Sequence, residues 1–151
     1  MHVALYQPEI PPNTDNIIRL CANTGARLHL IHPLGFRTDD RSLSRAGLDY
    51  HEQAVITHHA DWAAFCAWRA QQPPHLLWAY TTKATRRHDD ATPGADDILL
   101  FGPESRGLPA DLLDSLPGEQ RLRLPMRPGS RSLNLSNTVA VAVYQAWGRL
   151  I

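Results

Sequence analysis

Serine and asparagine side chains are concentrated in one short segment near the end of the chain. Four of the six residues from 132 to 137 carry a hydroxyl or amide group, and Leu133 and Leu135 separate them. The polar members are Ser132, Asn134, Ser136 and Asn137. A helix that begins here needs only one capping side chain, because few of its first backbone N–H groups lack partners. The surplus of polar groups therefore predicts a pocket for a polar ligand, with the leucines anchored in a core.

Two other segments combine glycine and proline with polar side chains. Residues 99–109 read LLFGPESRGLP, an apolar run followed by a loop that glycine and proline hold in one conformation. Residues 6–25 read YQPEIPPNTDNIIRLCANTG, a proline-rich loop that leads into a helix. In that helix Asn16 and Arg19 lie one turn apart, so their side chains share a face. Both segments therefore place polar groups beside an apolar scaffold.

Common enzyme motifs are missing from the sequence. Ser105 is not expected to be a hydrolase nucleophile, because GPESRG lacks the G-x-S-x-G spacing of a nucleophile elbow. The chain has neither a G-x-G-x-x-G fingerprint nor a P-loop, which argues against a dinucleotide or nucleoside triphosphate site. A nucleoside cofactor held by backbone groups needs neither motif.

Alternating strand and helix patterns must position the three segments. Strands are expected at 3–6, 28–31, 52–57, 75–81, 97–101 and 121–124, and helices at 14–24, 40–46, 60–70, 110–116 and 136–150. This alternation predicts an α/β domain with a mainly parallel sheet flanked by helices. In such sheets ligands bind beyond the carboxyl ends of the strands. The loops after Thr81, Phe101 and Leu124 should therefore meet at one edge.

Length and composition indicate one globular domain. The chain has 151 residues, 43% of them apolar, which is enough for its own core. No apolar run approaches the roughly 18 residues that span a bilayer, and we expect no signal peptide. Cys21 and Cys66 are isolated, and the eight histidines show no metal-ligand spacing with them. We therefore expect no disulfide, no metal, no membrane partner and a cytoplasmic location.

Charge is balanced over the whole chain but unevenly distributed. Fifteen basic and fifteen acidic residues give a net charge of zero, which argues weakly against a nucleic-acid partner. After Glu119 there is no acid, so the last 32 residues carry +5 and the first 119 carry −5. The basic residues of this last part are Arg121, Arg123, Arg127, Arg131 and Arg149. A local patch of this kind can bind phosphate groups even when the protein is neutral.

In chain order, the three segments resemble the three motifs of the SPOUT RNA methyltransferases, within the branch that methylates ribose 2'-oxygens. The motifs are N-x-x-R at Asn16 and Arg19, FGPESRGLP, and LPM with SRSLNLSN. PEIPPNTDNIIRLCANTG and RAGLDYH strengthen the resemblance, which runs from about Val3 to about Leu150. It implies a single SPOUT domain over residues 1–151, a C-terminal trefoil knot and a homodimer.

The resemblance implies an enzyme that uses S-adenosylmethionine (SAM) to methylate the wobble nucleotide, C or U, in the anticodon loop of leucine tRNAs. The implied cofactor-binding residues are Tyr80, Thr81, Gly102, Glu104, Gly107, Leu124, Met126, Ser132 and Leu133. Gly102 is expected to let the adenosyl group approach the backbone closely. Tyr80 stands where the family often carries a smaller aliphatic residue, and it is expected to bind through its backbone alone.

Arg19 and Asn134 are the implied catalytic residues. Methyl transfer requires the 2'-hydroxyl to be aligned with the methyl carbon and to lose its proton. Arginine is a poor base, because its pKa lies above about 12. Arg19 is therefore expected to orient the hydroxyl, stabilise a developing alkoxide or bind a phosphate, with Asn134 beside the ribose. The implied RNA contacts are Asn16, Arg127, Arg131 and Tyr144, and dimer packing is an equal alternative for Tyr144.

Three other functions compete with this interpretation. A non-catalytic RNA-binding module would have lost Arg19 or the 132–134 loop, and both are intact. A SPOUT enzyme that acts on another tRNA or rRNA ribose would carry the same motifs. A small hydrolase or nucleotide-binding enzyme would need a motif that this chain lacks.

Overall fold

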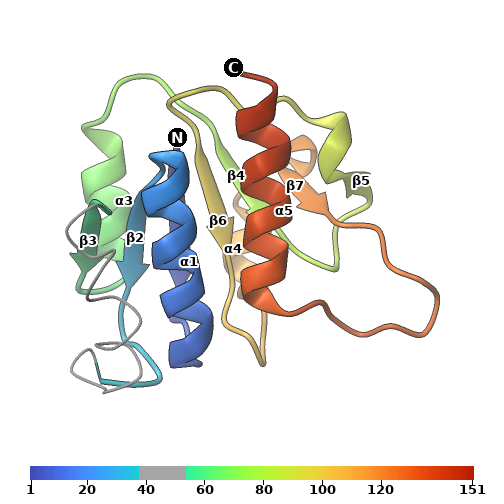
Figure 1. The fold of residues 1–151 in the computed structure, drawn as a ribbon, viewed down its shortest axis with the longest axis horizontal. Helices are drawn as coiled ribbons and strands as arrows, with labels where there is room; N and C mark the ends of the chain where they lie inside the picture. Colours follow the sequence, from blue (N-terminus) through green and yellow to red (C-terminus); the bar gives the residue numbers. More distant parts are fainter. Residues whose placement is uncertain (38–53) are drawn as a thin grey trace.

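The computed structural model describes residues 1–37 and 54–151. Within these residues the chain forms a seven-stranded sheet with the order β3-β2-β1-β6-β4-β7-β5 (Figure 1). The strands are β1 (His2–Tyr6), β2 (Arg27–Ile31), β3 (Ile56–His59), β4 (Leu77–Tyr80), β5 (Arg86–Arg87), β6 (Ile98–Phe101) and β7 (Arg121–Arg123). Every described pairing is parallel, which confirms the predicted α/β class with a parallel sheet.

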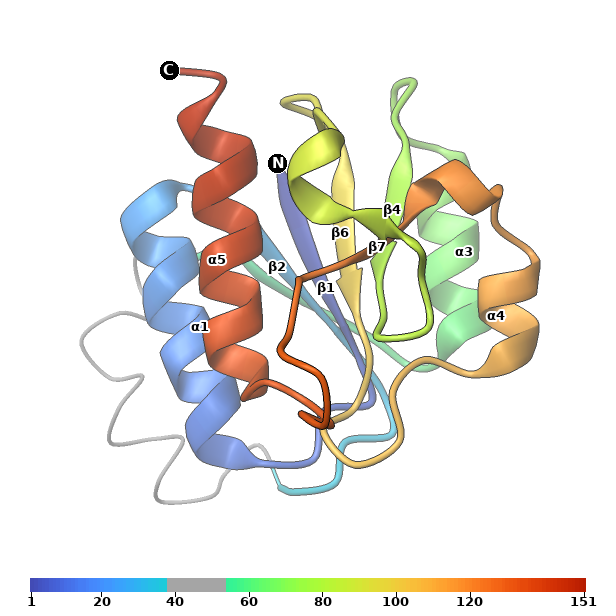
Figure 2. The same ribbon diagram turned by 90° about the vertical axis from the view of Figure 1, so that its right-hand side faces the viewer.

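Helices cover both faces of the sheet. They are α1 (Pro11–Thr24), α3 (Trp62–Ala70), α4 (Ala110–Asp114) and α5 (Leu135–Gly148), with 3-10 turns at His88–Asp90 and Gly118–Gln120. Figure 2 shows α1 and α5 on one face and α3 and α4 on the other. None of the described helices is both long and apolar enough to cross a membrane.

The core consists of two apolar clusters, one on each face of the sheet. Alternate strand residues point to opposite faces. In β6, Leu99 and Phe101 pack with the α1 and α5 side, whereas Ile98 and Leu100 pack with the α4 side. All four are buried, because a parallel sheet covered on both faces needs a continuous apolar run. Because the strands pair in parallel, their carboxyl ends share one edge of the sheet.

Most predicted elements are confirmed, with ends that differ from the predicted ones by at most four residues. The helix predicted at 14–24 begins earlier, at Pro11, because proline fits the first helical turn, where its missing N–H costs no hydrogen bond. The short helix predicted at 40–46 and the first part of the strand predicted at 52–57 lie outside the described residues. The two 3-10 turns and the short strand β5 were not predicted.

Three histidines form a hydrogen-bonded chain across β1, β2 and β3. His2 Nδ1 lies 2.9 Å from His29 Nε2, and His29 Nδ1 lies 2.8 Å from His59 Nε2. The ring of Trp68 from α3 covers the middle histidine, with centroids 4.4 Å apart. Burial, with smaller contributions from neighbouring positive groups, lowers the pKa of His29 to about 3 and that of His2 to about 4. The folded protein therefore holds these rings neutral.

Acid should destabilise the fold through this chain. In the unfolded chain His29 takes up a proton below about pH 6.5, whereas in the folded protein it stays neutral until about pH 3. Its contribution to stability is therefore complete above pH 6.5 and falls by about 1.4 kcal/mol per pH unit as the pH drops toward 3. We expect urea unfolding at pH 7.5, 6.0 and 5.0 to show this loss, and His29→Gln, which cannot titrate, to show a shallower one. Parallel pH profiles for the two proteins would contradict the assignment.

Candidate functional site

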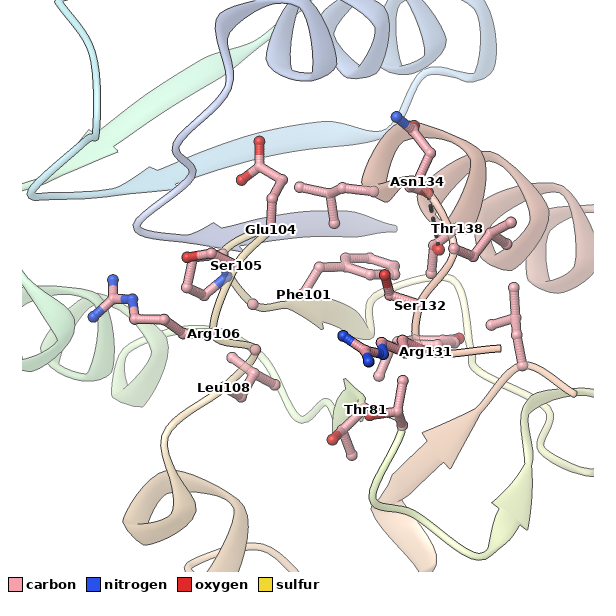
Figure 3. A pocket seen from close by; sticks show the side chains of 18 of the residues that line it. Thr81, Phe101, Glu104, Ser105, Arg106, Leu108, Arg131, Ser132, Asn134 and Thr138 are labelled. Atoms are coloured by element: carbon pink, nitrogen blue, oxygen red, sulfur yellow. Dashed lines mark hydrogen bonds between the residues drawn. The ribbon is translucent and has the colours of Figure 1, made fainter. Parts of the chain in front are cut away.

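A cavity of about 540 Å³ lies at the carboxyl edge of the sheet, where β4, β6 and β7 end (Figure 3). Its lining comes from the loops that follow these three strands, together with residues at the start of α1 and of α5. The predicted meeting of the loops after Thr81, Phe101 and Leu124 is thus confirmed. Both chain termini lie at the opposite edge of the sheet (Figure 1).

The structure brings all the sequence-predicted cofactor residues to this one cavity. The lining includes Tyr80, Thr81, Gly102, Glu104, Gly107, Leu124, Met126, Ser132 and Leu133. Its apolar part contains Phe101, Leu108 and Leu135, and its cations are Lys83, Arg106 and Arg131. A flat ligand with an apolar face and polar edges suits such a lining, and the volume is that of a small-molecule site.

Gly102 is required by the loop itself. A Cβ atom at this position would lie 2.4 Å from the Leu108 nitrogen and 2.5 Å from the Gly107 carbonyl carbon, so no other residue fits without moving the backbone. Gly107 has a φ of 69°, and its N–H donates to the Pro103 carbonyl at 3.0 Å. The close approach that the sequence analysis assigned to a ligand is therefore made, in the described structure, by residues 107–108.

Glu104 joins this loop to the start of α1. Its carboxylate accepts hydrogen bonds from the backbone N–H groups of Glu9 and Ile10, at 2.8 and 2.7 Å. The helix has no capping side chain of its own, and a negative charge is favourable at its N-terminus. In return the Glu9 carboxylate accepts from the Ser105 N–H and hydroxyl, and these bonds hold the pKa of Glu9 below its usual value. Glu104, predicted only as a cofactor ligand, thus clamps two loops together.

Asn13 is a site residue that the sequence analysis missed. Its amide is buried, donates to Glu104 Oε2 at 3.2 Å and accepts from Asn134 Nδ2 at 3.1 Å. It therefore joins the start of α1 to the loops that follow β6 and β7. The signal was present in the two prolines at 11–12, which mark a first helical turn and so place Asn13 beside the strand edge.

Asn134 serves both the helix and the cavity. Its side-chain oxygen accepts from the Ser136 hydroxyl at 2.6 Å and from the Asn137 N–H at 3.3 Å, which caps α5. One N–H of its amide reaches Asn13, and within the described structure the other makes no hydrogen bond. Asn134 also lines the cavity, so this second N–H is available to a ligand.

The other predicted residues divide between the cavity and the surface. Arg131 lines the cavity (Figure 3). Asn16 and Arg19, whose spacing predicts that they share a face of α1, are both exposed, and neither lines the cavity. Arg127 is exposed on the loop after β7, and Tyr144 on α5 is 49% exposed. In the described part of the chain, no group of three or more His, Cys, Asp or Glu is placed to hold a metal ion.

The chain is similar to known proteins over nearly its whole length. The model of the SpoU rRNA methylase family matches residues 1–144. A tRNA (cytidine(34)-2'-O)-methyltransferase of Escherichia coli strain K12 is 57% identical over 150 residues, which cover 99% of this chain and 94% of that protein. A protein of the same name from Burkholderia ambifaria is 62% identical over 148 residues, with 97% and 93% covered.

Solved structures agree with this grouping. One, described as giving structural insights into the 2-OH methylation of C/U34 on tRNA, is 42% identical with a TM-score of 0.89, over 99% of this chain and 89% of that one. The SpoU methyltransferase AviRb from Streptomyces viridochromogenes, in complex with the cofactor AdoMet, shares the fold with a TM-score of 0.84 at 22% identity. The match covers 99% of this chain and 60% of AviRb. The match of the family model over nearly the whole chain, together with relatives of this identity, shows that the chain belongs to the SpoU rRNA methylase family.

Proposed function

We propose that this protein is a SAM-dependent methyltransferase that modifies the ribose 2'-oxygen of nucleotide 34, the wobble position of tRNA. The observation that carries the proposal is one cavity built from all three motif loops, in a chain 57% and 62% identical to proteins named for this activity. A single SPOUT domain over residues 1–151 would then do the work in the cytoplasm. Leucine tRNAs with C or U at this position are the proposed substrates, on the strength of the motif resemblance.

The cavity fits SAM in size and in the chemistry of its lining. The apolar side chains of Phe101, Leu124 and Leu135 suit the purine, and the backbone groups around Leu124 suit its polar edge. Lys83, Arg106 and Arg131 are the lining cations that suit a carboxylate. When bound, SAM supplies an electrophilic methyl group, and displacement on a sulfonium needs no metal. AviRb binds this cofactor on the same fold, which supports the fit.

Alignment of the ribose falls to Asn134 and Arg19. Asn134 keeps one amide N–H for a ligand at the cavity, where it would hold the ribose oxygen in line with the methyl group. Arg19 lies outside the lining on the exposed face of α1. Its guanidinium would reach the RNA from that side, bind a phosphate and stabilise negative charge on the attacking oxygen. Asn16, Arg127 and Arg131 would hold the neighbouring backbone of the anticodon stem-loop.

The order of the strands supports the proposed trefoil knot. Strand β7 lies between β4 and β5, yet residues 81–85 alone join β4 to β5. Because all three strands run parallel, this short loop has to cross the chain of β7. Ordinary topologies avoid such crossings, whereas a knot requires one.

Exposed apolar side chains support the proposed homodimer. Leu133, Val141 and Tyr144 are 44%, 45% and 49% exposed, and all three lie on α5 or on the loop before it. Val141 and Tyr144 lie three residues apart on α5 and so share a face, and exposed apolar groups that adjoin one another are typical of a protein interface. In a dimer through this face, Tyr144 would pack against the second subunit, and the two subunits would together offer the surface that an anticodon stem needs.

Incubation with labelled SAM and total tRNA tests the function directly. We expect label in tRNA, at the 2'-oxygen of nucleotide 34 of leucine tRNAs, and equal incorporation with and without a metal chelator. Nucleotide mapping after nuclease digestion identifies the position. Binding of tRNA without any label would favour a non-catalytic RNA-binding module, and label at another tRNA or rRNA ribose would favour the other SPOUT activity. Loss of incorporation with the chelator would contradict the metal-free reaction.

A further inference from the structure

Tyr80 has an unusual position in the wall of the cavity. It is the last residue of β4, it is only 7% exposed, and it lines the cavity. Its ring stacks on Phe101 of the neighbouring strand β6, with centroids 4.7 Å apart and planes at 15°. The two residues are directly paired in the sheet register, so the strands themselves fix this stack. The Tyr80 ring is therefore held in one orientation before any ligand binds.

The hydroxyl of Tyr80 lacks a partner in the described structure. Buried tyrosine hydroxyls usually have one, and none of the described residues hydrogen-bonds to this group. Some described side-chain atoms have no partner and are sealed from solvent, for example Thr14 Oγ1 and His88 Nδ1. The Tyr80 hydroxyl is not among them. The hydroxyl oxygen therefore keeps some exposed surface, and Tyr80 is one of the residues that line the cavity.

The surroundings make this hydroxyl a neutral donor. Burial raises the pKa of Tyr80 well above its usual value, so the O–H stays protonated at physiological pH. Tyr80 belongs to the apolar cluster that contains Phe101 and Leu135, with Leu124 packed against it, and these three side chains offer no acceptor. A fixed, partly desolvated donor in an apolar wall is favourable only when a ligand atom accepts from it.

We infer that the Tyr80 hydroxyl donates a hydrogen bond to the adenosyl group of the bound cofactor, to a ring nitrogen or a ribose oxygen. This inference rests on the proposed function, and it goes beyond the backbone role expected for Tyr80. It makes Tyr80 a side-chain determinant of nucleoside recognition. The wall of Tyr80 and Phe101 then presents one polar atom on an otherwise apolar surface, which fixes the orientation of the purine.

Isothermal titration of wild type and Tyr80→Phe with S-adenosylhomocysteine tests the inference. We expect the variant to bind roughly threefold to tenfold more weakly, because one hydrogen bond to the ligand is lost. The urea midpoint of the ligand-free protein should stay the same or rise, since no hydrogen bond within the protein is lost. Tyr6→Phe is the matched control, because Tyr6 packs against Trp62 on the other face and does not line the cavity.

Analogues of S-adenosylhomocysteine identify the accepting atom. The 1-deaza, 3-deaza, 7-deaza, 2'-deoxy and 3'-deoxy compounds each lack one candidate acceptor. The one that lacks the true acceptor should bind more weakly to wild type but not to Tyr80→Phe. Equal affinity of wild type and variant for the parent compound overturns the inference. The inference is also overturned if Tyr80→Phe without ligand loses as much free energy of unfolding as it loses in free energy of binding. Failure of wild type itself to bind overturns the proposed function.

Discussion

Gly102→Ala is expected to lower the stability of the protein by about 1–3 kcal/mol and to weaken cofactor binding at least tenfold. The added methyl carbon would lie 2.4 Å from the Leu108 nitrogen and 2.5 Å from the Gly107 carbonyl carbon, and both are backbone atoms. No rotamer change relieves such a contact, so the loop has to open. Because residues 102–108 form one wall of the cavity, the change also displaces groups that line it. Urea unfolding and titration with S-adenosylhomocysteine measure the two effects.

Gly148→Ala is the matched control for this substitution. It adds the same methyl group at the end of α5, where nothing lies within 4 Å of the new atom. Alanine is a better helix former than glycine, so we expect stability to stay equal or rise by up to about 1 kcal/mol. If Gly102→Ala behaves like this control, the loop is looser than the structure indicates, and the close packing of residues 102 and 107–108 does not shape the cavity.

The sheet could be predicted from sequence because its central strands are buried on both faces. The run ILLF in β6 and the run LWAY in β4 contain only aliphatic and aromatic residues, without the polar alternation of a half-exposed strand. Such runs bounded by loops indicate parallel strands. Strand β5 gave no such signal. It consists of Arg86 and Arg87, and it is held by contacts distant in sequence: Arg86 donates to the Glu119 carbonyl and lies 5.8 Å from the centre of the Trp78 ring.

The cavity could be located from sequence, but its internal connections could not. Topology alone brings the loops after three parallel strands to one edge, which is why all the predicted cofactor residues line one cavity. The hydrogen bonds that join Asn13 to Glu104 and to Asn134 span 91 and 121 residues. No local pattern reports contacts of that separation. For the same reason Glu104 looked like a ligand group, although the start of α1 satisfies its carboxylate.

Arg19→Ala is expected to reduce methyl transfer at least 100-fold and to leave the cofactor affinity within about twofold of wild type. The two effects separate because Arg19 is exposed on α1 and does not line the cavity. Its guanidinium is proposed to act on the RNA, where it stabilises charge on the attacking oxygen or binds a phosphate. Single-turnover transfer to tRNA measures the first quantity, and titration with S-adenosylhomocysteine measures the second.

Arg27→Ala supplies the matched control for Arg19→Ala. Arg27 is also exposed, but it begins β2 and so lies at the amino edge of the sheet, opposite the cavity. Both substitutions remove one positive charge, so a purely global charge effect would slow both proteins equally. Full turnover in Arg19→Ala would remove Arg19 from the reaction. A large loss of cofactor affinity would mean that Arg19 supports the cavity from outside, through α1 and the bonds that tie Asn13 to Glu104 and Asn134.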